Sequence, residues 1–150
     1  AKVHNYRLDP FNSGDAGPTA YVEEGGVRLL RPLLAAGVDS ASELFAKLEG
    51  GAAFPRVEIV MNYAGAGGAV VDALVAQGVR GLVAAGTGNG TLHTDLEAAL
   101  VRAQAAGVRV VRATRCAAGR VLPHPGDQLP HSNGLSAVKA RIALMLELMA

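Results

Sequence analysis

The sequence predicts an α/β protein, an open parallel sheet with the order β-α-β-α-β-loop-α, preceded by a β-hairpin. Three apolar segments, residues 57–63, 81–85 and 108–114, have the length and composition of buried strands. Segments with helical periodicity separate them, and strands joined by helical crossovers pair in parallel. Residues 1–30 are more polar and have the pattern of strand and turn.

The first expected element is the hairpin. Tyr21-Val22-Glu23 and Val27-Arg28-Leu29-Leu30 flank Glu24-Gly25-Gly26, where glycine supplies the positive φ of a tight turn. A hairpin alone is marginally stable in water. We therefore expect it to dock on another surface, which this chain need not contain.

A connector is expected over residues 31–53. It contains Pro32, Ala35-Ala36-Gly37, a short helical stretch over residues 42–48, and Gly50-Gly51. Proline and glycine at this density indicate a boundary between domains.

The regular part of the chain begins with the strand at residues 57–63. A glycine-rich loop, residues 65–68, leads into a helix, and Gly78 suits the C′ position that follows a helix. The next strand, residues 81–85, is apolar throughout, as expected where helices cover both faces of a sheet.

The second helix of this part is predicted from a capping box. Thr94 and Glu97 stand in the S/T-x-x-E relation, which makes Thr94 the expected cap, and Gly107 ends the helix. The third strand, residues 108–114, follows.

A polar, proline-rich segment, residues 123–133, precedes the last helix, which is expected to begin near Ser136. Residues 142–149 are apolar almost all round this helix. Such a helix is buried by the core or by a partner, and a dimer interface fits the pattern best.

The composition excludes several classes of function. The chain has 150 residues, half of them apolar, a net charge of +1 with scattered basic residues, 4% aromatic residues and no Trp. Nucleic-acid binding needs a clustered basic face or stacking aromatics, so we expect none. No apolar run is long enough to cross a membrane, and Cys116, the single cysteine, allows neither an internal disulfide nor a cysteine metal cluster.

The compartment is not indicated. The chain begins with Ala1 and shows no signal peptide, so we expect a processed or partial product of a soluble protein, cytoplasmic or periplasmic.

A glycine-rich loop follows the second strand, and ligands bind beyond the carboxyl ends of the strands in such sheets. Gly86-Thr87-Gly88-Asn89-Gly90 is G-x-G-x-G, which is neither the dinucleotide fingerprint G-x-G-x-x-G nor a Walker motif. One interpretation is an anion site at the start of a helix. Another is a tight turn that only needs glycine.

A third interpretation comes from resemblance. Seven segments carry it: F-N-S at 11–13, G-P at 17–18, Y-V at 21–22, F-P-R-V-E-I-V-M-N-Y at 54–63, A-G-T-G-N-G-T-L at 85–92, G-R-V at 119–121 and K-A-R-I-A-L-M-L at 139–146. Together, and in this order along the chain, these segments resemble the bacterial-type L-asparaginases, which are amidohydrolases.

The resemblance implies a domain organisation. Family members have a large N-terminal α/β domain, a linker and a smaller flavodoxin-like C-terminal domain. By this comparison residues 1–31 are the terminal hairpin of an N-terminal domain that this chain otherwise lacks, residues 32–53 are the linker, and residues 54–150 are the C-terminal domain.

The resemblance also implies that the catalytic groups lie elsewhere. The family's nucleophilic threonine belongs to a T-G-G-T-I segment, and further catalytic groups belong to an H-G-T-D-T segment; neither segment occurs here. His93-Thr94-Asp95 lacks the glycine and follows the wrong strand. We expect no catalytic residue in this chain, and no activity from the chain alone.

What this chain would supply is a set of contacts to a second subunit. Family members are dimers or tetramers in which the C-terminal domain of one subunit completes the active site of its partner. The resemblance assigns Thr91, Asn89 and Asp127 to substrate binding there, with Asn89 expected to hold the loop or lie behind it. It implies an amino acid amide as substrate, asparagine or also glutamine, without cofactor or metal; the spacing of His124 and His131 does not suit metal ligands.

Two other functions remain open. The chain could be a non-catalytic α/β oligomerisation or small-ligand-binding module, or a nucleotide-binding domain that uses the glycine loop.

Overall fold

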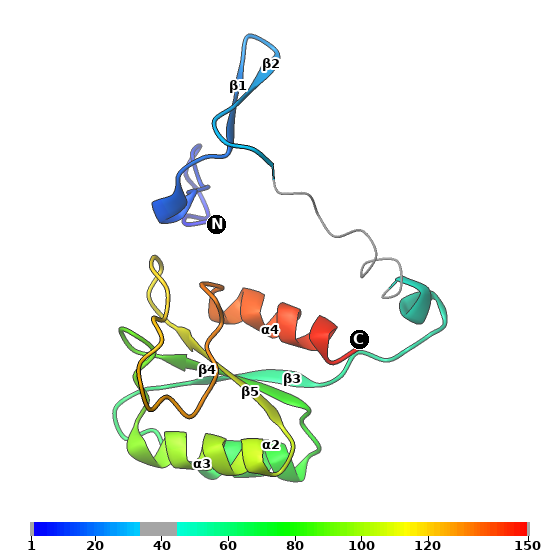
Figure 1. The fold of residues 1–150 in the computed structure, drawn as a ribbon, viewed down its shortest axis with the longest axis vertical. Helices are drawn as coiled ribbons and strands as arrows, with labels where there is room; N and C mark the ends of the chain where they lie inside the picture. The colour runs from blue at the N-terminus through cyan, green and yellow to red at the C-terminus, as the bar shows by residue number, and fades with distance from the viewer. Residues whose placement is uncertain (1, 34–44, 150) are drawn as a thin grey trace. The chain divides into compact units, whose positions relative to one another are not determined.

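A computed structural model describes residues 2–33 and 45–149 of the chain (Figure 1). The chain divides into two compact units, residues 1–39 and residues 40–150. The domain boundaries expected at residues 31 and 53 remain predictions.

The first unit contains the predicted hairpin. Strands β1 (Ala20–Glu23) and β2 (Gly26–Leu29) pair in antiparallel fashion. The turn consists of Glu24 and Gly25, with φ values of 48° and 77°. Positive φ at both central residues matches the right-handed twist of the strands, so Glu24 as well as a glycine takes this conformation. A short 3-10 helix, η1 (Gly14–Ala16), precedes the hairpin.

The hairpin buries neither of its faces within residues 2–33. Val22 and Val27 on it are 78% and 69% exposed. Arg28 forms an ion pair with Glu23 at 2.7 Å, but both side chains are at least half exposed. An ion pair so open to water contributes little to stability, and a two-stranded hairpin by itself is marginally stable in water.

The second unit is the predicted α/β sheet. Strands β3 (Val57–Met61), β4 (Gly81–Gly86) and β5 (Arg109–Thr114) form a three-stranded sheet in the order β3-β4-β5, with both pairs parallel.

Helices cover both faces of this sheet. Helices α2 (Ala69–Ala76) and α3 (Thr94–Ala105) lie on one face, and α4 (Ala137–Glu147) lies on the other (Figure 1). Gly78 and Gly107 follow α2 and α3 with φ values of 76° and 91°, as the sequence predicts. Of the short helix expected over residues 42–48, residues 45–49 are helical, and residues 42–44 lie outside the described part.

The strand β4 is buried at every position, which confirms the prediction from its apolar run. Its alternate side chains enter two separate cores. Leu82 and Ala84 pack with Leu96 and Leu100 of α3, because successive residues of a strand point to opposite faces. Val83 points the other way and belongs to the core that α4 closes.

The segment expected as a polar loop, residues 123–133, also completes the edge of the sheet. The Arg112 amide donates to the Pro130 carbonyl at 2.7 Å, and the Ser132 amide donates to the Arg112 carbonyl at 2.9 Å. Residues 130–132 thereby cover an edge whose backbone groups would otherwise be unpaired.

The predicted cap of α3 is wrong. Thr94 is the first helical residue, and His93 is the N-cap, with extended backbone and with its Nδ1 accepting from the Asp95 amide at 3.3 Å. Thr94 already has helical backbone geometry, whereas an N-cap residue lies just outside the helix. The cap position therefore falls to His93. The start of α4 is as predicted, with Ser136 as its N-cap.

The described residues of the second unit cover helix α4 on one side only. Ala140 and Leu144 are buried, whereas Val138 and Ile142 are 67% and 43% exposed. The core of this unit therefore accounts for only part of the apolar surface that the sequence places on this helix.

Candidate functional site at the carboxyl edge of the sheet

The glycine loop that joins β4 to α3 is a closed turn. The Thr87 amide donates to the Thr91 carbonyl at 3.0 Å, and the Thr91 amide donates to the Thr87 carbonyl at 2.8 Å. Each of these two amides thus donates to the carbonyl of the other residue, which removes both as donors to a phosphate. Thr91 is exposed at the end of this turn.

The glycines of this loop are explained by its geometry. A Cβ on Gly86 would collide with the carbonyl group of Gly90, far inside contact distance. Gly88 and Gly90 have φ values of 49° and 79°, in the left-handed region that favours glycine. The pattern G-x-G-x-G therefore follows from the turn itself, without a nucleotide.

Asn89 ties the glycine loop to the segment that follows β5. Its Oδ1 accepts from the Leu122 amide at 2.7 Å, and its Nδ2 donates to the Leu122 carbonyl at 3.1 Å. A second tie runs from the Thr114 hydroxyl to the Gly88 carbonyl at 2.6 Å. The structure thus gives Asn89 a contact that positions the loop, and its assignment to substrate remains a prediction.

Asn62 fixes the end of the glycine loop that enters α3. It lies directly after β3, is only 6% exposed, and its Oδ1 accepts from the His93 amide at 2.7 Å. Sequence reasoning missed this residue. Its signal was a polar side chain directly after an apolar strand at the edge where parallel strands end.

Asp127 forms an ion pair with a buried arginine. Its Oδ2 lies 2.6 Å from the Nη2 of Arg112 on β5 and also accepts from the His124 amide at 2.8 Å. The Arg112 side chain is 10% exposed and that of Asp127 is 23% exposed. The Arg112 guanidinium, helped by the His124 amide, lowers the pKa of Asp127 below its ordinary value of 3.8.

The site residues predicted from the sequence therefore lie on two loops that are tied together. Thr91 and Asn89 belong to the first loop, residues 87–93 between β4 and α3, and Asp127 belongs to the second, residues 115–136 between β5 and α4. Within the described part of the chain, the contacts of Asp127 run to Arg112 and His124, and Thr91 bonds back to Thr87. An exposed hydroxyl and a partly exposed carboxylate can bind a small polar molecule, with the carboxylate as counter-charge for an ammonium group.

Two threonine hydroxyls around this loop, those of Thr87 and Thr114, are committed to structure. The Thr87 hydroxyl donates to the Thr91 carbonyl at 3.3 Å, and that of Thr114 donates to Gly88. A threonine is a weak nucleophile unless a neighbouring base activates it. The part of the chain that the structure describes contains no group of three His, Cys, Asp or Glu side chains arranged to hold a metal ion.

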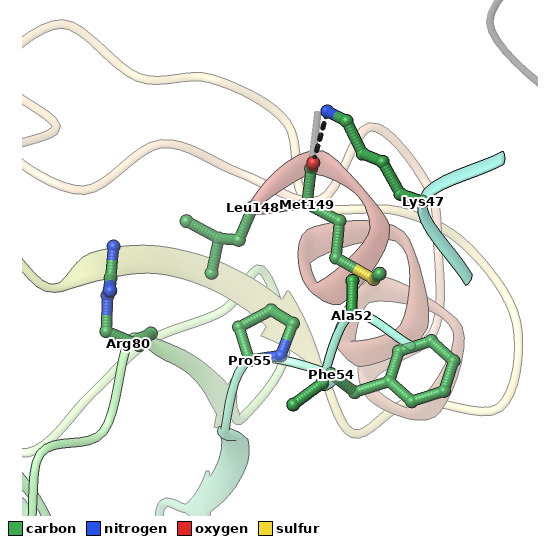
Figure 2. A pocket seen from close by; sticks show the side chains of 8 residues that line it. Lys47, Ala52, Phe54, Pro55, Arg80, Leu148 and Met149 are labelled. Atoms are coloured by element: carbon green, nitrogen blue, oxygen red, sulfur yellow. Dashed lines mark hydrogen bonds between the residues drawn. The ribbon is translucent and has the colours of Figure 1, made fainter. Parts of the chain in front are cut away.

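A cavity of about 410 Å³ lies at the opposite end of the sheet from the glycine loop. Figure 2 shows Pro55, which precedes β3, and Arg80, which precedes β4, on its wall. Lys47 donates across it to the Met149 carbonyl at 2.7 Å. The cavity is therefore separate from the candidate site.

None of the described helices is both long and apolar enough to span a bilayer.

Comparison with known protein families matches residues 56–150 to the glutaminase/asparaginase C-terminal domain. Among curated proteins, the chain is 41% identical over 97 residues to L-asparaginase 2 of Bacillus subtilis, covering 63% of this chain and 26% of the relative. It is 32% identical over 152 residues to L-asparaginase 2 of Escherichia coli, covering 98% of this chain and 43% of the relative.

The relatives also include a second kind of protein. The chain is 34% identical over 122 residues to one of the subunits of the glutamyl-tRNA(Gln) amidotransferase of Aeropyrum pernix, covering 80% of this chain and 27% of the relative. Among solved structures, a probable cytoplasmic L-asparaginase from Campylobacter jejuni matches with a TM-score of 0.82 and 30% identity, over 99% of this chain and 46% of that one. The chain thus spans less than half the length of these relatives.

Proposed function

The chain belongs to the glutaminase/asparaginase family through its C-terminal domain, and we propose that it supplies substrate-binding residues to the active site of a partner subunit in an amidohydrolase. The observation that carries this proposal is Thr91. Its side chain is exposed directly after the turn Gly88-Asn89-Gly90, and the turn is closed by two backbone hydrogen bonds and tied to Leu122.

The proposed reaction is hydrolysis of the side-chain amide of asparagine to aspartate and ammonia, with glutamine as the second candidate substrate. Relatives named L-asparaginase and glutaminase-asparaginase support this substrate class. A threonine nucleophile outside this chain would form the acyl-enzyme, and backbone amides would stabilise the tetrahedral intermediate. The chain alone would be inactive.

We assign the residues in the following way. Thr91 would contact the substrate, and Asp127, whose side chain is 23% exposed, would offer its carboxylate to the substrate ammonium. Asn89 would act through the loop, because both of its side-chain polar atoms bond to Leu122. The protein would be a homo-oligomer, and the exposed apolar side of α4 supports this.

One alternative is favoured by a specific observation. Several relatives are amidotransferase subunits, which suggests that the amide nitrogen could be passed to glutamyl-tRNA(Gln) instead of being released. A non-catalytic module is the other alternative. The exposed hairpin argues against it, because a self-sufficient module has little need for a strand pair that buries neither face.

The test is ammonia release from L-asparagine and L-glutamine by the complete natural protein that carries this chain. We expect Thr91→Ala to raise the KM about tenfold, the equivalent of one hydrogen bond, and Thr91→Ser to stay near the parent. Absence of ammonia release with either amide would overturn the hydrolase proposal. Amidation of glutamyl-tRNA(Gln) would then identify the transferase.

A further inference from the structure

We propose that Arg112 is a positioning residue that locks the loop carrying Thr91 to the loop carrying Asp127. Arg112 lies on β5, next to the strand from which the glycine loop emerges. The inference rests on the proposed function only for the statement that these loops form a binding site.

The stem of Arg112 packs beneath the glycine loop. A Cβ on Gly90 would lie 3.2 Å from the Cγ and 3.3 Å from the Cδ of Arg112, and 3.0 Å from the Cγ2 of Val121. Glycine at this position therefore gives room to the methylene groups of the arginine. The stem thereby fixes how closely the turn after β4 approaches β5.

The head of Arg112 holds the second loop. Its Nη2 is 2.6 Å from Asp127, whose same oxygen also accepts from the His124 amide. One arginine thus touches the first loop with its stem and fixes the second loop with its charge. Leu122, at the start of the second loop, is bonded to Asn89 of the first. Leu122 and Asp127 are consequently both held, in addition to the backbone hydrogen bonds of Pro130 and Ser132 with Arg112 further along the second loop.

Stability alone does not account for an arginine at this position. Only 8% of the residue is exposed, and its Nε is buried without a hydrogen-bond partner among the described residues. Buried ion pairs are often no more stabilising than apolar side chains of similar size, since both charges lose their hydration. The ion pair fixes the position of the two loops relative to each other, and an apolar pair of the same size would not do so.

The first test is hydrogen exchange of the 150-residue chain. In Arg112→Met, which keeps most of the stem, we expect the amides of Thr91 and Leu122 to exchange about tenfold faster relative to those of α2. Arg109→Met is the matched control, because Arg109 lies on the same strand and its ion pair with Glu147 is more than half exposed. This control should leave both amides unchanged.

A second variant keeps the test decisive if Arg112→Met fails to fold. Arg112→Met/Asp127→Leu removes both charges together, and we expect it to fold with near-parental resistance to urea while Thr91 and Leu122 remain poorly protected. Parental protection of both amides in the double variant would overturn the proposal. So would parental protection in Arg112→Met itself.

A kinetic readout separates positioning from a purely structural role. In the complete natural protein, Arg112→Met should raise the KM for the amide substrate about tenfold with kcat within about twofold. Arg112→Lys should recover part of this loss. A structural role would lower the amount of active protein and leave KM unchanged, and that result would overturn the proposal. If the natural protein releases no ammonia, the proposed function fails, while the exchange experiment still decides the role of Arg112.

Discussion

Gly86 is the glycine of this loop that leaves least room for a side chain. Its missing side chain allows the backbone of Gly90 to approach within 2.7 Å of where a Cβ would stand. The atoms that block this position belong to the backbone, so they cannot move aside by a rotamer change.

We therefore predict that Gly86→Ala lowers the free energy of unfolding by at least about 2 kcal/mol. Gly67→Ala is the matched control, because a Cβ there meets nothing within 4 Å and the residue has no positive φ. It should change stability by no more than about 0.5 kcal/mol. Urea unfolding measures both, and equal stabilities of the two variants would contradict the account of the turn.

The pairing of Asp127 predicts a dependence of stability on pH. Because Arg112 lowers the pKa of Asp127 in the folded chain, ionised Asp127 contributes stability above its unfolded value of 3.8. That contribution is lost as the pH falls through the lower folded value. Asp127→Asn should therefore be less stable than the parent at neutral pH, and the difference should shrink below pH 3.8.

Urea unfolding at several pH values measures this difference. Asp72→Asn is the comparison, since the ion pair of Asp72 with Arg102 is 61% exposed on both sides and such pairs contribute little. A gap between parent and Asp127→Asn that persists unchanged in acid would show that Asp127 acts through its shape alone.

At the scale of elements, α3 shows how a local motif can mislead. Thr94 and Glu97 have the spacing of a capping box, yet the N-cap is His93, whose backbone is also fixed by the buried Asn62. The tertiary contact from the residue after β3 decides where the chain turns into the helix. It prevails over the preference of threonine for the cap position.

We predict that His93→Ala destabilises the chain by about 1 kcal/mol, the usual value of a side-chain cap. His93→Asn should keep the cap. Thr94→Ala should change the free energy of unfolding by less than about 0.5 kcal/mol, as for an exposed residue without special contacts. Chemical denaturation followed by circular dichroism compares the three variants, and a larger loss in Thr94→Ala than in His93→Ala would restore the capping box.

At the scale of the whole molecule, the apolar side of α4 has no cover within the described residues of the second unit. Val138 and Ile142 lie one turn apart on the helix and share the same face. We predict that this face lies in the interface of the proposed homo-oligomer.

Val138→Glu should therefore dissociate the complete natural protein in sedimentation experiments. It should leave the unfolding of the isolated 150-residue chain within about 0.5 kcal/mol, because the residue is 67% exposed there. Ala143→Glu, at another exposed position of the helix, is the control for added charge. An oligomer that tolerates Val138→Glu as well as the control would exclude this face from the interface.

Much of the architecture could be predicted because its signals are local. The strands β3, β4 and β5 follow from apolar runs, the hairpin from its turn residues, and the ends of α2 and α3 from Gly78 and Gly107. The position of Thr91 after a glycine turn was equally visible. Each of these signals lies within a few neighbouring residues.

The α/β class, the family segments and the location of the glycine loop at the carboxyl edge follow from local patterns in the sequence. Three long-range contacts do not: Arg112 holds Asp127, Asn89 binds Leu122 across 33 positions of the chain, and residues 130–132 close the edge beside β5. Periodicity reports which face of an element is apolar, whereas each of these polar contacts joins segments whose meeting depends on how parallel strands align their ends.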